Sequence, residues 1–184
     1  MTYSKDHIKE EDLDRYFEKI YYGLIESLEV PEGGPFGAGV VSGSGALLSV
    51  GTNKVLTSYD PSRHAEIDAI ARAGKQKSTF LFPGSLILAT HFPCLMCYNA
   101  IKLSGMKDGY YIFDPEETEE LFDLKGSPLL EDLNIPPEVQ SADTALQLQK
   151  YSSDKVKELY YDKLVEKWHT KYKQLFPPEF FEQI

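Results

Sequence analysis

One segment near the middle of the chain restricts the fold more than any other, because it predicts two neighbouring strands. The run SLILAT (85–90) has the composition of a buried strand, and GYYIF (109–113) predicts a second one. A helix is expected between them over about 94–103, ended by Gly105. Strand, helix and strand in this order imply a right-handed crossover and a parallel pair of strands in one sheet.

Further helices and strands are expected on both sides of this unit. Apolar residues at steps of three and four predict an amphipathic helix over 10–29. Two strands, FGAGVV (36–41) and ALLSV (46–50), are joined by a glycine turn, and a helix is expected over about 64–75. A long helix is expected over about 153–175. Its apolar face comprises Val156, Tyr160, Leu164, Trp168, Tyr172 and Leu175.

The pattern is weaker over 114–154. Two short acidic helices are expected, over 116–124 and 127–133, followed by a loop at Pro136 and Pro137 and by a stretch without a clear pattern. The segment LTSYDPSR before the helix at 64–75 predicts a loop, because Asp-Pro is a turn signal.

Strands that alternate with helices predict an α/β fold. We expect a three-layer α/β/α sandwich with a central mixed sheet. The length of 184 residues fits one domain over 1–184. Its core is expected over about 10–135, followed by the helix over 153–175 and a short tail.

The charge and the apolar content of the chain limit its partners and its compartment. A net charge of −10 disfavours a nucleic-acid polymer as partner, because phosphate backbones are usually met by basic patches. No run approaches the length of a membrane helix, and the N-terminus lacks the apolar core of a signal peptide. We therefore expect a cytoplasmic protein that does not bind a membrane.

Four residues in two short stretches suggest a metal site. RHAEIDAI contains His64 and Glu66, and HFPCLMC contains Cys94 and Cys97, the only two cysteines. One imidazole and two thiolates are ligands of the type that zinc prefers, and three ligands leave one tetrahedral position for water. Glu66 lies two residues from His64, close enough to exchange a proton with that water.

Each half of this pattern has a plainer interpretation. A histidine at a helix start is often a cap or a surface residue, and a CxxC pair can be a redox centre. However, no tryptophan or strand–CxxC context of the thioredoxin type surrounds the cysteines. The two halves together form the H-x-E…P-C-x-x-C signature of zinc-dependent base deaminases.

On this signature the sequence resembles the cytidine deaminase superfamily, in its branch of guanine, tRNA-adenosine and nucleotide deaminases. The resemblance covers about 33–113. The segments GGPFGA (33–38), GTNKV (51–55) and TSYDPSRHAE (57–66) are most similar to bacterial guanine deaminases. The resemblance implies Zn²⁺ as cofactor, a homodimer, and hydrolytic deamination of a small nucleobase, nucleoside or nucleotide, such as guanine to xanthine.

The resemblance also implies roles for individual residues. His64, Cys94 and Cys97 would bind zinc, Glu66 would move protons as the catalytic acid and base, and the backbone amide of Cys94 would donate to the attacking oxygen of water. The expected substrate contacts are Phe36, Asn53, Ala65, His91 and Asp123. For Phe36 a core position, for Asn53 a turn-stabilising role and for His91 a surface or supporting role are the alternatives.

Two departures from the guanine deaminase pattern leave the substrate open. Phe92 stands where glutamate usually precedes Pro-Cys, as in deoxycytidylate deaminases, and Leu124 replaces an acid that reads the guanine amine. An apolar leucine would leave that buried amine unpaired, at a cost of about 1–3 kcal/mol.

The alternatives are therefore a deoxycytidylate or cytosine deaminase, a tRNA-adenosine deaminase and an inactive zinc-binding scaffold. Arg63 and Lys54 are the candidate phosphate contacts for a nucleotide substrate. Phe180 and Phe181 in the last residues resemble, in position and aromatic content, the segment that closes the site in some guanine deaminases, and a disordered end is the favoured alternative.

Overall fold

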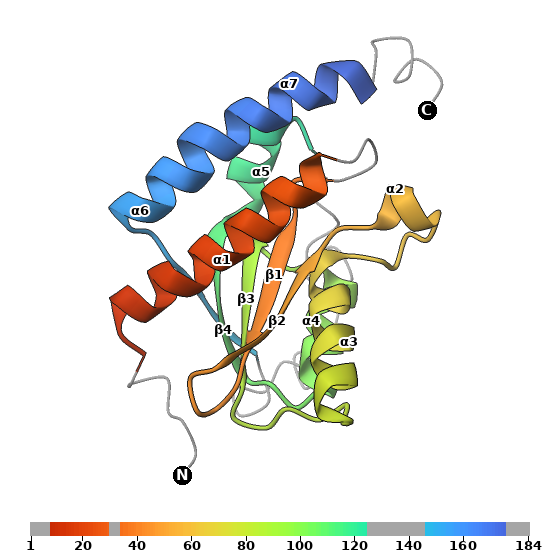
Figure 1. The fold of residues 1–184 in the computed structure, drawn as a ribbon, viewed down its shortest axis with the longest axis vertical. Coiled ribbons are helices and arrows are strands. Elements are labelled where there is room, and N and C mark those ends of the chain that lie inside the picture. The colour runs from red at the N-terminus through yellow and green to blue at the C-terminus, as the bar shows by residue number, and fades with distance from the viewer. Residues whose placement is uncertain (1–7, 30–33, 125–145, 176–184) are drawn as a thin grey trace, which may run out of the picture.

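The computed structural model describes residues 8–29, 34–124 and 146–175. Five strands form one sheet in the order β2-β1-β3-β4-β5 (Figure 1). β1 pairs with β2 and β3 in antiparallel orientation, whereas β3, β4 and β5 run parallel to one another. The parallel pair and the mixed sheet expected from the sequence are thus confirmed. The strands are β1 (Gly37–Val41), β2 (Leu47–Thr52), β3 (Leu86–His91), β4 (Asp108–Phe113) and β5 (Gln147–Lys150).

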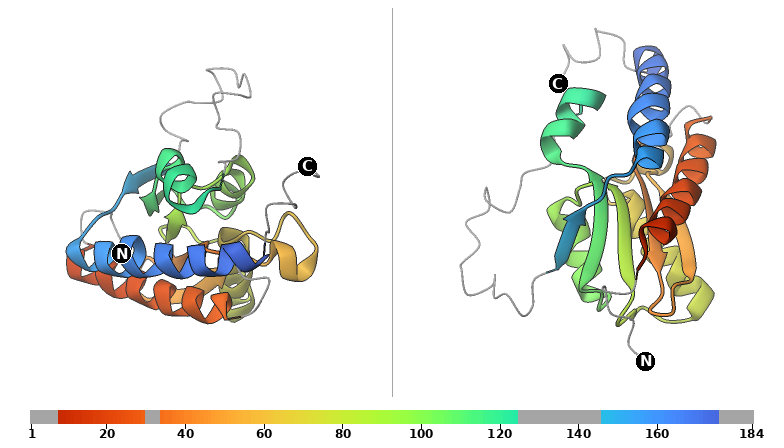
Figure 2. Two further views of the ribbon diagram at one scale, coloured as in Figure 1. Left: turned by 90° about the horizontal axis from the view of Figure 1, so that it is seen from above. Right: turned by 90° about the vertical axis from the view of Figure 1, so that its left-hand side faces the viewer.

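Helices cover both faces of this sheet, which confirms the three-layer α/β/α sandwich. In Figure 1 the strands run between α1 on the left and α3 with α4 on the right. Figure 2 shows that the C-terminal helical segment lies alongside α1. The helices are α1 (Glu10–Leu28), α2 (Val55–Ser58), α3 (Ala65–Lys77), α4 (Leu95–Leu103), α5 (Pro115–Phe122), α6 (Asp154–Val156), η4 (Lys157–Leu164) and α7 (Val165–Leu175). None of the described helices combines the length and the apolar content needed to cross a bilayer.

The two faces of the sheet bury different side chains. The face under α1, α5 and the C-terminal helical segment packs large rings, among them Phe17, Tyr160 and Trp168. The face under α3 and α4 is built largely from smaller residues, such as Ala65 and Ala69. Small side chains let α3 approach the sheet closely, and this places the start of α3 beside the strand ends.

The C-terminal helix differs from the expected α-helix in its middle. Residues 157–164 form π-helical turns, between α-helical segments. Val156, Tyr160, Leu164 and Trp168 follow one another at steps of four and are all buried. In an α-helix of 3.6 residues per turn, side chains spaced four residues apart gradually move around the helix axis. The π turns contain more residues per turn, and they keep these four side chains on one side. The side chains of Tyr172 and Leu175 lie outside the described residues.

Two elements were missing from the sequence prediction. β5 lies in the stretch that has no clear pattern, and a helical turn, α2, occupies part of the predicted loop before His64. α5 matches the first acidic helix, whereas the second one, over 127–133, and Phe180 and Phe181 lie outside the described residues. The boundaries of a single domain over 1–184 stay a prediction.

Candidate active site

The structure brings three predicted metal ligands together at the starts of two helices. His64 is the residue before α3, Cys94 is the residue before α4, and Cys97 lies in the first turn of α4. One ligand atom of each lies within 4.8 Å of the other two. Residues about thirty positions apart in the sequence thus form one cluster, which consists of one imidazole and two sulfur atoms.

The spacing of this cluster fits a zinc ion. His64 Nδ1 lies 3.5 Å from Cys94 Sγ. Zinc–nitrogen bonds of about 2.0 Å and zinc–sulfur bonds of about 2.3 Å in a tetrahedron separate the two atoms by about 3.5 Å. These two atoms therefore already have the separation that zinc needs, and a set of three ligands leaves one tetrahedral position for another ligand.

Local structure explains why the ligands lie at helix starts. His64 and Cys94 both have extended backbones, with φ of −69° and −64°, which is the usual conformation of the residue that precedes a helix. Pro93 comes directly before Cys94 and fixes the direction of entry. The partial positive charge of a helix start favours thiolates there.

The two thiols share their protons unequally. The pKa of Cys94 is lowered to about 4, because Cys97 and His64 form hydrogen bonds with its sulfur. The pKa of Cys97 is raised, because the sulfur of Cys94 holds its proton and because the side chain is buried. Cys94 thus loses its proton readily, whereas Cys97 loses its proton only when a metal cation replaces it.

Glu66 lies beside the ligands, in the first turn of α3. Only 8% of the residue is exposed, and Cys97 Sγ lies 3.4 Å from its Oε2. Burial raises the pKa of this carboxyl. A buried carboxyl next to three metal ligands is placed to exchange protons with a molecule at the fourth position.

Phe36 and Asn53 are neighbours, and the residue after Asn53 pairs with the segment that leads into His64. The backbone amide of Asn53 donates to the carbonyl of Phe36 at 3.0 Å, and Lys54 donates from its backbone to Arg63, the residue before His64. The Oδ1 of Asn53 accepts from the backbone amide of Val55 at 3.1 Å. Asn53 therefore stabilises the turn, as one interpretation expects, and this leaves its amide nitrogen with two donor hydrogens.

The remaining predicted contacts fall into different surroundings. Ala65 is buried in the first turn of α3. His91 is buried at the end of β3, which excludes the surface role. Asp123 follows α5 in a left-handed conformation, with φ of 55°, and its exposed carboxylate lies 3.9 Å from His169 Nδ1. All three stay predictions as substrate contacts.

Lys54 already has a partner within the protein. Its Nζ lies 2.7 Å from Oδ1 of Asp68, whose side chain is 7% exposed, and Arg72 contacts the other oxygen at 2.9 Å. A lysine that neutralises a buried carboxylate is less available to a phosphate, so this role remains only for Arg63. The sequence analysis missed Asp68. The sequence signal for a buried Asp68 is its place in the helix that starts at Ala65, directly before Ala69, which faces the sheet.

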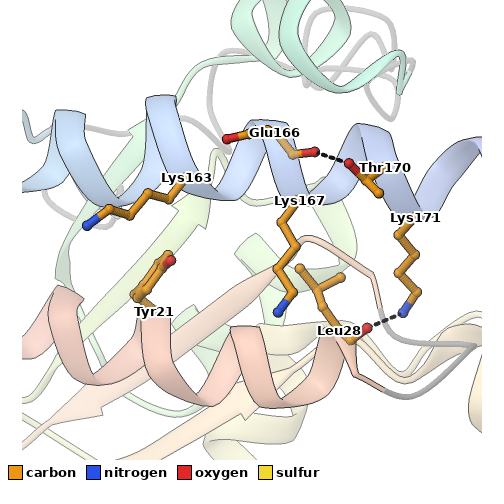
Figure 3. Close-up of a pocket in the computed structure, with 7 residues that line it drawn as sticks. All are labelled: Tyr21, Leu28, Lys163, Glu166, Lys167, Thr170 and Lys171. Carbon is orange, nitrogen blue, oxygen red and sulfur yellow. Dashed lines mark hydrogen bonds between the residues drawn. The ribbon is translucent and has the colours of Figure 1, made fainter.

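A groove of about 550 Å³ lies on the opposite face of the sheet, between α1 and α7 (Figure 3). Lys163, Lys167 and Lys171 line it together with Tyr21. Lys163 and Lys167 are ion-paired with Glu158 and Glu29, and Lys171 donates to the carbonyl of Leu28. These ammonium groups are already neutralised or bound, so the groove is not the candidate site.

Comparison with known proteins agrees with this geometry. The chain is 35% identical over 95 residues to guanine deaminase from Bacillus subtilis, a match that covers 52% of this chain and 60% of that protein. It is 36% identical over 94 residues to tRNA-specific adenosine deaminase from Aquifex aeolicus, with 50% of this chain and 60% of that protein covered. The chain thus spans less than two thirds of the length of these relatives.

Solved structures share the fold. Guanine deaminase from Nitrosomonas europaea aligns with a TM-score of 0.64 at 19% identity, covering 86% of this chain and 83% of that one. Residues 12–113 match the cytidine and deoxycytidylate deaminase zinc-binding region. This match contains all three ligands and Glu66, and the cofactor of the site is zinc. The chain belongs to the cytidine and deoxycytidylate deaminase family.

Proposed function

We propose that this protein is a zinc-dependent hydrolase that deaminates a small nucleobase, nucleoside or nucleotide. The observation that carries the proposal is the place of Glu66, buried beside His64, Cys94 and Cys97 without being needed as a ligand. A site that only held zinc for structural reasons would normally be closed by a fourth protein ligand.

The residues of the site divide the work. Bound zinc supplies the Lewis acidity that activates water. Glu66 accepts a proton from the water at Oε2, delivers it to a ring nitrogen, and then assists the departure of ammonia. The carbon–oxygen bond forms first at the ring carbon, and the bond to the amino nitrogen breaks afterwards, when Glu66 has passed the second proton of the water to that nitrogen and ammonia leaves. The backbone amide of Cys94 donates to the attacking oxygen.

Phe36 and Asn53 would bind the base. The half-buried ring of Phe36 offers an apolar wall, and the amide hydrogens of Asn53, which have no partner among the described residues, can donate to the edge of a base. Guanine is the first substrate to test, because the chain is 35% identical over 95 residues to the Bacillus subtilis guanine deaminase. Leu124 in place of an acid counts against guanine, since its amine would lose a partner.

A tRNA adenosine is the second candidate. The Aquifex aeolicus tRNA-specific adenosine deaminase is as similar as the guanine deaminase, at 36% identity. The net charge of −10 opposes it, because RNA is usually bound by basic surfaces. We therefore place a free base or nucleotide first, in a cytoplasmic homodimer.

The test is ammonia release by the zinc-loaded protein from guanine, adenine, cytosine, their nucleosides and deoxycytidylate, with an anticodon stem-loop RNA as a further substrate. We expect turnover of one compound that falls about 10²- to 10⁴-fold in Glu66→Gln, because a general acid and base contributes that factor. Glu119→Gln, which changes an exposed acid on α5, is the matched control.

Zinc content separates the possible outcomes. If Glu66→Gln keeps its zinc but loses turnover, the result supports a role of Glu66 in proton transfer and not in zinc binding. If the wild-type protein binds zinc and turns over nothing in the panel, the inactive-scaffold alternative is favoured. Loss of zinc in Glu66→Gln would contradict the proposed role of this carboxyl.

A further inference from the structure

His91 combines two properties that rarely occur together, deep burial and an unused hydrogen-bonding atom. The residue is 5% exposed, and its Nε2 has no hydrogen-bond partner among the residues that the structure describes. Buried polar atoms are almost always paired, so an exception calls for an explanation, such as a ligand.

The position of His91 in the sheet places it on the face that carries the zinc ligands. Side chains alternate along a strand, and Ile87, four residues earlier on β3, packs against the α3–α4 face. β1 and β3 pair from Ala38 opposite Ala89, and Phe36 directly precedes β1 while His91 ends β3. The two rings lie in contact, with centroids 4.5 Å apart.

His91 is also close to the metal ligands in the sequence. It is the last residue of β3, and Cys94 follows three positions later. In open sheets with parallel strands, ligands bind beyond the carboxyl ends of the strands. The ring of His91 therefore lies with that of Phe36 at this end of the sheet.

The contact of Nδ1 with the Thr90 hydroxyl favours one of the two positions for the proton of the ring. The hydroxyl of Thr90 accepts from the backbone amide of Gly37 at 2.9 Å and lies 2.8 Å from His91 Nδ1. Among the described residues, Nδ1 is thus the acceptor available to the hydroxyl hydrogen, because the amide of Gly37 can only donate. Nδ1 then accepts, and the proton of the neutral ring is on Nε2.

The ring stays neutral in the folded protein. Burial lowers the pKa of His91 to about 3. Phe113 and Phe122 pack against it from the other sides, with ring centroids 5.0 Å and 4.9 Å away. Nε2–H is therefore an uncharged donor held among aromatic rings.

We propose that His91 donates a hydrogen bond from Nε2 to an acceptor atom of the substrate base, either a carbonyl oxygen or an unprotonated ring nitrogen. The inference rests on the proposed function and sharpens it. A donor at this point selects bases that present an acceptor there and rejects bases that present an amino group.

The test compares His91→Leu with His91→Gln, whose amide nitrogen can still donate. Leu88→Ile, a buried change on the same strand, is the control. For the base that the wild-type protein deaminates, we expect kcat/KM to fall about 10- to 100-fold in His91→Leu and to recover largely in His91→Gln. His91→Leu also removes the acceptor of the Thr90 hydroxyl, so the melting temperature of each variant is measured beside its activity and kcat/KM is compared for the folded protein.

Deaza analogues of that base, in which one ring nitrogen is replaced by C–H, identify the acceptor if it is a ring nitrogen. The wild-type protein should lose the same 10- to 100-fold toward one analogue, and His91→Leu should treat this analogue and the parent base alike. If the acceptor is a carbonyl oxygen, His91→Leu lowers kcat/KM by the same factor for the parent base and for every analogue. His91→Gln still recovers the activity in that case. Activity of His91→Leu within twofold of wild type, or a loss that His91→Gln does not recover, would overturn the inference.

A silent wild-type protein would count against the proposed function, and a second measurement then decides the role of His91. The Nε2–H resonance of the zinc-loaded protein can be followed by ¹⁵N NMR while guanine, adenine, cytosine or deoxycytidylate is added. A downfield shift with one of them supports donation to a base. No shift with any of them overturns it, and leaves the ring as a packing residue whose N–H faces the phenylalanines.

Discussion

The two faces of the sheet are built from different residues and serve different purposes. The face under α1 and η4 buries stacked and edge-on rings, such as Phe17 against Tyr151 and Tyr160. The face under α3 packs alanines, and Gly51 of β2 lies so close that an added Cβ would be 2.3 Å from the backbone of Ala65. Large apolar area stabilises the first face, whereas close backbone approach positions the metal ligands on the second.

The largest effect is expected at the metal cluster. Cys97→Ala removes one of three ligands, and we expect zinc affinity to fall by more than the roughly 10- to 100-fold that loss of a hydrogen bond to a metal ligand costs. Competition with a chromogenic chelator measures this. Met96→Ala, one residue away with an exposed side chain, is the control and should bind zinc normally. Equal affinity of Cys97→Ala and wild type would rule out the assigned ligand set.

The next largest effect is expected on the aromatic face. Phe17 is fully buried, and Phe17→Ala should lower the free energy of unfolding by about 3–5 kcal/mol, because it leaves a cavity among rings. Urea unfolding of the zinc-loaded protein measures the loss. The folded variant should keep the zinc affinity of wild type. A large drop in zinc affinity would show that the two faces are not independent.

Gly51→Ala tests the close approach on the other face. The new methyl group meets backbone atoms of Ala65 and Ala69, which cannot move without moving α3. We expect a loss of about 3 kcal/mol, at the upper end of overpacking costs, together with weaker zinc binding. Gly39→Ala is the matched control, since its Cβ would meet only the side-chain ends of Ile20 and Leu47. Weaker zinc binding in both variants would argue against a special role for α3.

The smallest effect is a dependence on pH at His91, which contacts both faces. Its pKa is about 3 in the folded protein, whereas an unfolded histidine titrates near 6.5. As the pH falls below 6.5, the unfolded chain takes up a proton that the folded ring does not, so stability falls. Between pH 7.5 and pH 5 the wild-type protein should lose about 2 kcal/mol more than His91→Leu does. Parallel urea titrations at both pH values would show this, and identical losses would mean that the ring is protonated in the folded state.

The sequence by itself determined much of the architecture and the metal ligands. The strand, helix and strand over 85–113 implied the parallel pair, because crossovers have one hand and local periodicity reports burial. The cluster of His64, Cys94 and Cys97 followed from residue types that few other sites combine. Both depend on short-range patterns, which a sequence displays directly.

Only the tertiary structure decided what depends on distant partners. β5 is a strand because it pairs with β4 across a long intervening segment, and its own residues are mostly exposed. Lys54 binds Asp68, and His91 lies among Phe36, Phe113 and Phe122, because the sheet brings separate segments to one edge. No local sequence pattern shows which of these side chains will be in contact, because that depends on strand register and on how closely the helices approach the sheet. The unused Nε2 of His91 is visible for the same reason only in the folded chain.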